Sequence, residues 1–176
     1  RIQVYLPARF RETRRYPLLI VNDGEQFLRY ASLKAVLDNL IHRLDVAPLV
    51  VALTDPVDRL TEYADNTEHA RFIAEELLPA VEKRYPIDAR PAARGLMGVS
   101  FGAVASLATA WRYPGVFDRL LIQSCSFHFE DTVEQTRRSA VDPVGQFVSP
   151  FLNNSTGNRI SGIRGGKDTA RERGNI

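Results

Sequence analysis

Short apolar runs alternate along the chain with longer stretches in which apolar residues recur every three or four positions. The short runs, each typical of a strand, lie at residues 2–6, 18–21, 49–53, 95–99 and 120–124. Because strands that alternate with helical stretches form βαβ units, the pattern predicts an α/β fold with a mainly parallel sheet flanked by helices. The continuous run at 18–21 indicates a strand covered on both faces, whereas 2–6 alternates like a half-buried strand.

The helical stretches have recognisable beginnings and ends. Ser32 is a candidate N-cap for a helix over residues 33–44, whose apolar positions follow the i, i+3, i+4, i+7 pattern. Asn66 or Thr67 is a candidate N-cap for a long helix that ends before Pro86, because proline has no backbone N–H to donate.

Three polar segments are predicted to lack regular structure. Residues 22–24, Asn-Asp-Gly, are a turn signal, and residues 54–66 are predicted to form a loop. From 127 to 158 the periodicity is lost, which fits a lid-like insertion, a loosely packed excursion or a stretch where residues of the parent protein are missing. A strand at 159–163 and a turn at 165–168 are predicted beyond it.

Composition narrows the class of protein. The chain has 176 residues, of which 44% are hydrophobic and 25% charged, so we expect one α/β domain over residues 1–176, incomplete at its C-terminus. The formal net charge of +2 gives no reason to expect nucleic acid or an anionic membrane as a partner. No apolar run approaches the roughly 18 residues of a membrane helix. The oligomeric state is not predicted.

Cys125 is the single cysteine, which excludes an internal disulfide framework and a multi-cysteine zinc site. Because it follows a buried strand, we expect a small packed residue with an unreactive thiol. A lone thiol fits a reducing compartment, so we expect a cytoplasmic protein. The only methionine is Met97, and we therefore expect an incomplete N-terminus.

The segment Gly-Val-Ser-Phe-Gly at residues 98–102 is the strongest candidate for chemistry. A strand is predicted to enter it and a helix to leave it, so Ser100 would sit on a sharp turn at the carboxyl end of the strand. The hydroxyl would then face a substrate, with the helix N-terminus beneath the negative charge that develops during acyl transfer. The alternative is a glycine-rich turn that merely joins a strand to a helix.

Further segments extend the likeness to a known family. Residues 94–103, 113–117 and 123–127 closely resemble the enterochelin-esterase and esterase-D-like family of serine esterases, and other family landmarks lie in order at 5–7, 22–24 and 59–63. The resemblance covers about residues 1–130. It implies an α/β-hydrolase fold, with its mainly parallel central sheet, and hydrolysis of a small-molecule carboxylic ester through an acyl-enzyme on a serine.

The resemblance also implies the roles of individual residues. Ser100 would attack the ester carbonyl, and the backbone N–H groups of Phe101 and Glu25 would bind the oxyanion. The acid of the triad would be Asp168, in the turn Gly-Gly-Lys-Asp. The side chain of Glu25 would have to point away from the oxyanion, because only its backbone amide would be used.

The general base is the part of the family pattern that this sequence does not supply. The family has a histidine some tens of residues after the acid, whereas the sequence stops at Ile176, so we expect the base to lie beyond it. His42 and His69 are predicted to be surface residues. His128 is predicted to line the pocket, with the role of base as the alternative. Arg59 could meet a polar substrate at the mouth of the pocket, or equally pair with Glu62 on the surface.

Two other functions stay open. A catalytically inactive hydrolase-like domain would use the same cleft to bind a ligand or partner, and an acyltransferase would pass the acyl group to an alcohol instead of water. Metal catalysis is not expected, because no His-x-x-x-His or similar cluster has ligand spacing. No other cofactor is expected, and the glycine-rich segments lack the Gly-Lys-Ser/Thr ending of a phosphate-binding loop.

Overall fold

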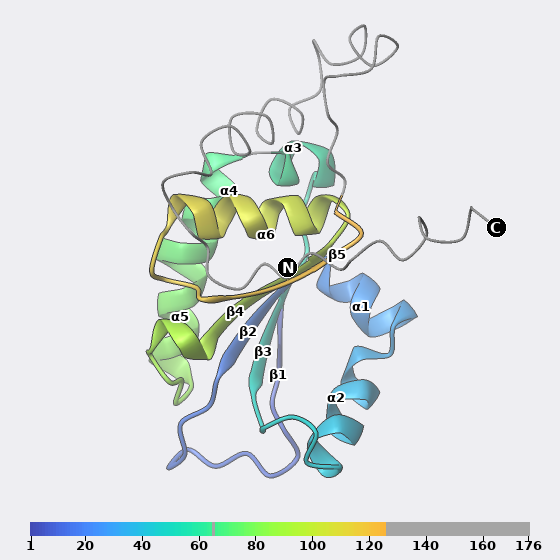
Figure 1. Cartoon of the computed structure of the whole chain (residues 1–176), viewed down its shortest axis with the longest axis vertical. Helices are drawn as coiled ribbons and strands as arrows, with labels where there is room; N and C mark the ends of the chain where they lie inside the picture. Colours follow the sequence, from blue (N-terminus) through green and yellow to red (C-terminus); the bar gives the residue numbers. More distant parts are fainter. Residues whose placement is uncertain (65, 126–176) are drawn as a thin grey trace, which may run out of the picture.

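The computed structural model describes residues 1–64 and 66–125, which form a five-stranded sheet with helices on both faces (Figure 1). The strands are β1 (Ile2–Tyr5), β2 (Leu18–Asn22), β3 (Val50–Thr54), β4 (Arg94–Val99) and β5 (Arg119–Gln123). The helices are α1 (Gly24–Tyr30), α2 (Leu33–His42), α3 (Arg59–Tyr63), α4 (Thr67–Arg71), the π-helix η1 (Phe72–Leu77), α5 (Leu78–Arg84), the 3₁₀-helix η2 (Pro91–Ala93) and α6 (Phe101–Arg112).

The strand order places a topological switch point in the middle of the sheet. The order is β1-β3-β2-β4-β5, with β1 antiparallel to β3 and the other pairs parallel. From β2 the chain continues to β3 on one side, and from β4 it continues to β5 on the other. In open α/β sheets, ligands bind outside the carboxyl ends of the strands at such a point. The predicted mainly parallel sheet is confirmed.

Alternate residues of the central strand serve two separate cores. Leu18 and Ile20 of β2 pack with residues of η1 and α5 on one face, whereas Leu19 and Val21 pack with residues of α2 on the other. All five residues of β2 and of β3 are buried, as the continuous apolar runs predict. Figure 1 shows the corresponding arrangement, with α1 and α2 on one side of the sheet and α4, α5 and α6 on the other.

The helix that follows the serine is buried around its whole circumference over most of its length. Every residue from 102 to 110 is buried. The helix packs on β4 and β5 and also contacts α3 and α4, so both its inner and outer faces are covered. Small residues make this possible, because five of these nine positions are alanine or glycine. Helix α6 therefore has no solvated side between residues 102 and 110.

The boundaries of the long second helix agree with the prediction and reveal an internal irregularity. The Asn66 side chain accepts hydrogen bonds from the backbone N–H groups of Glu68 and His69, which confirms it as the N-cap. Helical structure then runs through α4, η1 and α5 to Arg84. The π-helix ends at Leu77, two residues before Pro79, which has no N–H to donate to the preceding turn.

Three local predictions are wrong. Helix α1 begins inside the segment predicted to be a turn, and α3 lies within the predicted loop. Ser32 has a left-handed backbone (φ 48°) and makes no capping hydrogen bond through its side chain. The predictions for residues 127–158, 159–163 and 165–168 lie outside the described residues.

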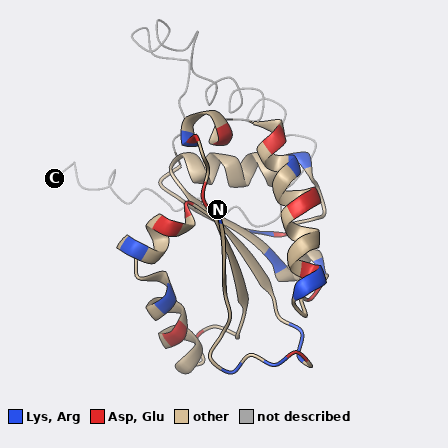
Figure 2. Ribbon diagram, turned by 180° about the vertical axis from the view of Figure 1, so that it is seen from behind, with Lys and Arg blue, Asp and Glu red and all other residues tan. Residues whose placement is uncertain are grey.

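Charged side chains are distributed over helices and loops, with both signs interspersed and few charges on the strands (Figure 2). Within the part of the chain that the structure describes, none of the helices is both long and apolar enough to cross a membrane.

Candidate active site

Ser100 occupies the turn between β4 and α6, at the carboxyl end of a strand next to the switch point. Its backbone has φ 56° and ψ −118°, a conformation that residues with a side chain rarely adopt. Its N–H donates to the carbonyl of Gln123 at 3.1 Å, while its carbonyl accepts from Ala103 at 3.1 Å. The turn is therefore tied both to β5 and to the first turn of α6.

The glycines at positions 98 and 102, two residues before and after the serine, lie where other atoms approach closely. A Cβ at position 98 would overlap the carbonyl of Gly102, because strand and helix meet there without room for a side chain. A Cβ at position 102 would lie 3.0 Å from the carboxylate oxygen Oδ2 of Asp23. The motif thus packs α6 directly against β4 and against the end of β2, which is what a strand–serine–helix elbow needs.

Backbone strain is concentrated at one edge of the sheet. Three neighbouring parallel strands, β2, β4 and β5, are each followed directly by a non-glycine residue with positive φ: Asp23 at 58°, Ser100 at 56° and Ser124 at 46°. Such conformations cost on the order of 1–3 kcal/mol each and persist only where the surroundings enforce them. Their grouping at the carboxyl ends of adjacent strands marks this edge as the candidate site.

The two backbone amides expected to bind an oxyanion have different surroundings. Phe101 is the first residue of α6, so its N–H has no acceptor within the helix. The N–H of Glu25 donates to Oδ1 of Asp55 at 2.8 Å, so in this structure it is bonded to a carboxylate. The Glu25 side chain is exposed and pairs with Arg1 at 3.3 Å.

Arg59 and Asp23 form the main ion pair of the site. Arg59 reaches from α3 and donates through Nε and Nη2 to both carboxylate oxygens of Asp23, at 2.9–3.0 Å. The hydroxyl of Tyr63 accepts the backbone N–H of Asp23 at 3.0 Å. Burial, and then the Asp23 carboxylate, raise the pKa of Tyr63, so this hydroxyl stays protonated. Of the alternatives predicted for Arg59, the structure shows an ion pair, but with Asp23 and not with Glu62.

A buried polar network lies directly behind this ion pair, centred on Asn22. The Asn22 amide nitrogen donates to the Ser106 hydroxyl at 3.0 Å and to the Gly102 carbonyl at 3.3 Å. Its amide oxygen contacts Nε2 of His69 at 3.2 Å and accepts from the Thr54 hydroxyl at 3.4 Å. One side chain, only 1% exposed, therefore joins β2, β3, α4 and α6.

The prediction that His69 lies on the surface is wrong, because the imidazole is 8% exposed and packs against Tyr63. His42 is exposed, as predicted. Burial lowers the pKa of His69 below 6.5, against the weaker opposing influence of Glu62 and Asp23. The imidazole is therefore neutral at neutral pH, and its 4.0 Å approach to the Glu62 carboxylate is not an ion pair there.

This buried histidine predicts an acid-sensitive fold. Because the pKa of His69 is lower in the folded than in the unfolded state, the unfolded chain binds the proton more readily. The His69 contribution to stability is complete above pH 6.5 and is lost as the pH falls from there through the lower, folded-state pKa. Chemical denaturation at a series of pH values between 8 and 5 measures this loss.

His69→Gln, which keeps a side-chain donor toward Asn22, should flatten the decline of stability in that range. His42→Gln is the matched control, because it removes an exposed histidine and should leave the decline unchanged. An unaltered pH dependence in His69→Gln would contradict the prediction.

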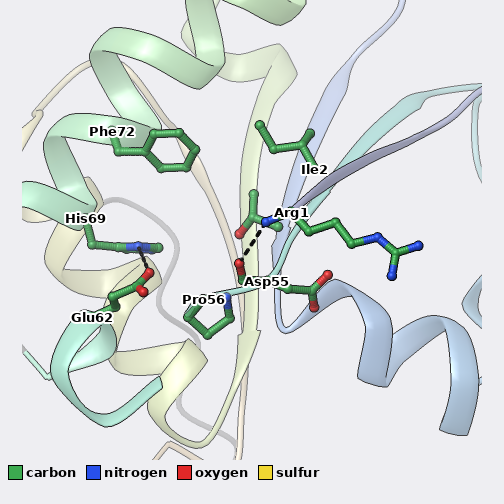
Figure 3. Close-up of a pocket in the computed structure, with 8 residues that line it drawn as sticks. Arg1, Ile2, Asp55, Pro56, Glu62, His69 and Phe72 are labelled. Carbon is green, nitrogen blue, oxygen red and sulfur yellow. Dashed lines mark hydrogen bonds and ion pairs between the residues drawn. The ribbon is translucent and has the colours of Figure 1, made fainter. Parts of the chain in front are cut away.

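A cavity of about 260 Å³ opens at the same end of the sheet, between β1, the end of β3 and α3 with α4 (Figure 3). Figure 3 shows Glu62 and His69 facing each other in the wall of this cavity. The other Glu62 oxygen accepts the backbone N–H groups of Val57 and Asp58, which fixes the start of α3. Ser100 is not among the residues that line this cavity.

Three further residues were singled out from the sequence, of which the structure describes only Cys125. Asp168 and His128 lie outside the described residues. Cys125 is half-buried against Val104 and Ala108, and burial raises the pKa of its thiol to about 12, as expected of an unreactive cysteine. Within residues 1–64 and 66–125, no group of three or more His, Cys, Asp or Glu side chains could hold a metal ion.

Comparison with known proteins places these features in a family. Residues 1–160 match the Esterase family, described as "Putative esterase". The uncharacterized protein YjcH of Bacillus subtilis is 30% identical over 128 residues, 69% of this chain and 53% of that protein. The iron(III) enterobactin esterase of Escherichia coli is 32% identical over 114 residues, 63% of this chain and 28% of that protein. The chain thus spans about half, or less, of these relatives' length.

Solved structures give the same result. The enterochelin esterase of Shigella flexneri matches with a TM-score of 0.67 and 26% identity, over 79% of this chain and 37% of that chain. A ferulic acid esterase, 20% identical with a TM-score of 0.65 over 82% of this chain and 62% of that one, shares the fold.

The sheet, its covering helices and the serine elbow define an α/β-hydrolase fold. The chain belongs to the Esterase family and is enterochelin-esterase-like, which confirms the resemblance drawn from the sequence.

Proposed function

We propose that the protein is a serine esterase that hydrolyses a small-molecule carboxylic ester through an acyl-enzyme on Ser100. The observation that carries the proposal is the strained backbone of Ser100 at the junction of β4 and α6, beside the switch point of the sheet. Strain of this kind persists at sites where the position of a side chain matters for chemistry. Membership of the Esterase family supports the choice of ester as the substrate class.

In the proposed reaction, Ser100 Oγ forms a bond to the ester carbonyl carbon while the carbonyl oxygen becomes an oxyanion. The N–H of Phe101, at the start of α6, donates to this oxyanion, and the helix N-terminus favours its charge. Collapse of the intermediate expels the alcohol, which takes up the proton that the general base removed from the Ser100 hydroxyl, and leaves an ester on Ser100. Water then cleaves this ester, releases the carboxylic acid and restores the serine hydroxyl.

The second oxyanion donor in this proposal is the N–H of Glu25, which must exchange the carboxylate of Asp55 for the oxyanion. We assign the role of the triad acid to Asp168 and a pocket-lining role to His128, and the mechanism requires a histidine as the general base. Family membership supports an acid and a base in these roles, because serine alone is a weak nucleophile at neutral pH.

Labelling with a fluorophosphonate tests the proposal on the full-length protein. The probe should attach to the peptide that contains Ser100, as located by mass spectrometry, and Ser100→Ala should lower the ester-hydrolysis rate by at least about 10⁴-fold. Ser32→Ala, at an exposed serine that precedes α2, is the control and should leave the labelling and the hydrolysis rate unchanged.

A full-length protein that is neither labelled nor active on simple esters would contradict the proposal and indicate a binding domain. Transfer of the acyl group to an added alcohol faster than to water would indicate an acyltransferase instead.

A further inference from the structure

We propose that Arg59 is a positioning residue that holds the Ser100 elbow and the turn after β2 in one fixed arrangement. The inference rests on the proposed esterase function and adds a residue to it. Arg59 comes from α3, a short helix between β3 and α4, so it belongs to neither of the two strands whose ends it joins.

The first contact of Arg59 is with the turn that follows β2. Its guanidinium holds both carboxylate oxygens of Asp23, whose side chain is 5% exposed. Asp23 has a left-handed backbone and directly precedes α1, the helix that presents the N–H of Glu25. Fixing the Asp23 side chain therefore fixes the direction in which this helix leaves the sheet.

The second set of contacts is with the residues on either side of the serine. Nη2 of Arg59 donates to the carbonyl of Val99 at 3.4 Å. The guanidinium carbon lies 5.6 Å from the centre of the Phe101 ring, within the range of a cation–π contact. Arg59 thus contacts the residue before Ser100 and the residue after it.

The chemistry of these contacts suits arginine and not lysine. A planar guanidinium can bind a carboxylate through two parallel N–H groups and at the same time stack on an aromatic ring. It also stacks on Tyr63, at 5.6 Å from the ring centre. A lysine ammonium is a point charge on a flexible stem, so it could pair with Asp23 without fixing Val99 and Phe101.

The site has a physical need for such a clamp. Asp23 and Ser100 both have strained backbones, and each would relax if its surroundings allowed it. A shift of about 1 Å at a reacting centre can cost on the order of 10² in rate. Because one side chain restrains both turns, it also fixes their separation, on which the two oxyanion donors depend.

Two simpler roles for Arg59 make different predictions. A substrate-binding arginine would raise KM when replaced and leave the reactivity of Ser100 unchanged. A purely stabilising ion pair would lower the unfolding temperature and leave the reactivity of the folded enzyme unchanged. A positioning residue lowers the rate at which Ser100 reacts, lowers kcat and changes KM little.

The experiment compares the fluorophosphonate labelling rate at Ser100, kcat and KM for a simple ester, and the unfolding temperature in the full-length protein. The variants are Arg59→Lys, Arg59→Gln and Asp23→Asn, the last chosen because asparagine tolerates the left-handed backbone. Arg90→Gln is the matched control, because Arg90 makes the same two-pronged pair with Asp88 at the opposite end of the sheet.

We expect the labelling rate and kcat to fall roughly tenfold in Arg59→Lys and roughly 100-fold in Arg59→Gln, with KM within about twofold. Asp23→Asn should fall between them, and Arg90→Gln should match the wild type. If Arg59→Gln does not fold, Arg59→Lys and Asp23→Asn carry the test.

Wild-type labelling rates in the folded Arg59 and Asp23 variants, or an effect confined to KM, would overturn the positioning role and leave the esterase proposal standing. Absence of labelling in the wild-type protein would overturn the esterase proposal, and the positioning role would fall with it.

Discussion

Replacing Asn22 with alanine is expected to lower the free energy of unfolding by about 4 kcal/mol. The reason is that the side chain satisfies several polar groups that have no access to water. Its removal leaves the Thr54 hydroxyl and the His69 ring without this partner, and it opens a space at the meeting point of β2, β3, α4 and α6. The Ser106 hydroxyl keeps only its bond to the Gly102 carbonyl. Each unsatisfied buried group costs about 1–3 kcal/mol.

Urea denaturation followed by circular dichroism measures the effect. Asn39→Ala is the control, because Asn39 is exposed on α2 and its replacement should change stability by less than about 0.5 kcal/mol. Equal losses in the free energy of unfolding in the two variants would contradict a stabilising role for the network around Asn22.

Gly98→Ala is expected to lower both the stability of the fold and the reactivity of Ser100. The added methyl group would overlap the carbonyl of Gly102, and neither partner of this contact is a flexible side chain that could move aside. We expect a loss of about 3 kcal/mol in stability, at the upper end for overpacking. We also expect a fall of roughly 100-fold in the labelling rate of Ser100, because α6 can recover space only by moving away from β4.

Gly115→Ala is the control that separates the steric overlap at position 98 from the general cost of replacing a glycine with alanine. Gly115 has φ 77°, but a Cβ there would have no atom within 4 Å. The cost should be limited to the backbone penalty of about 1 kcal/mol, with normal labelling. A Gly98→Ala variant that labels as fast as Gly115→Ala would contradict the steric account of the elbow.

The sheet could be predicted from the sequence because each strand is a local signal. Every strand of the described region coincides with a predicted apolar run to within a residue or two. Helix α1 was missed because its start depends on a distant contact. A Cβ on Gly24 would overlap Leu53, so the glycine that signalled a turn serves close packing instead. Helix α3 has a local signal in the sequence, because the side chains of Asp58 and Glu62 both accept backbone N–H groups at its start.

The site could be predicted only in part, for a related reason. Ser100 and the glycines beside it form a contiguous motif, and the structure brings them together as expected. The partners that surround the motif come from other elements. Asn22 and Asp23 looked like a turn, and His69 looked like a surface residue in a first helical turn. Their roles depend on contacts between β2, α3, α4 and α6, which lie far apart in the sequence, so no local pattern predicts them.

The burial of α6 determines where the molecule tolerates substitutions. The helix that sets the position of Ser100 is buried along nine consecutive residues, five of which are alanine or glycine. The segments that follow β2 and β3 carry the exposed residues of this edge, such as Glu25 and Leu60. Substitutions can therefore accumulate in these exposed segments while Ser100 keeps its position. Under the proposed function, a lineage built on this chain could change the ester that it hydrolyses and keep the same geometry of attack.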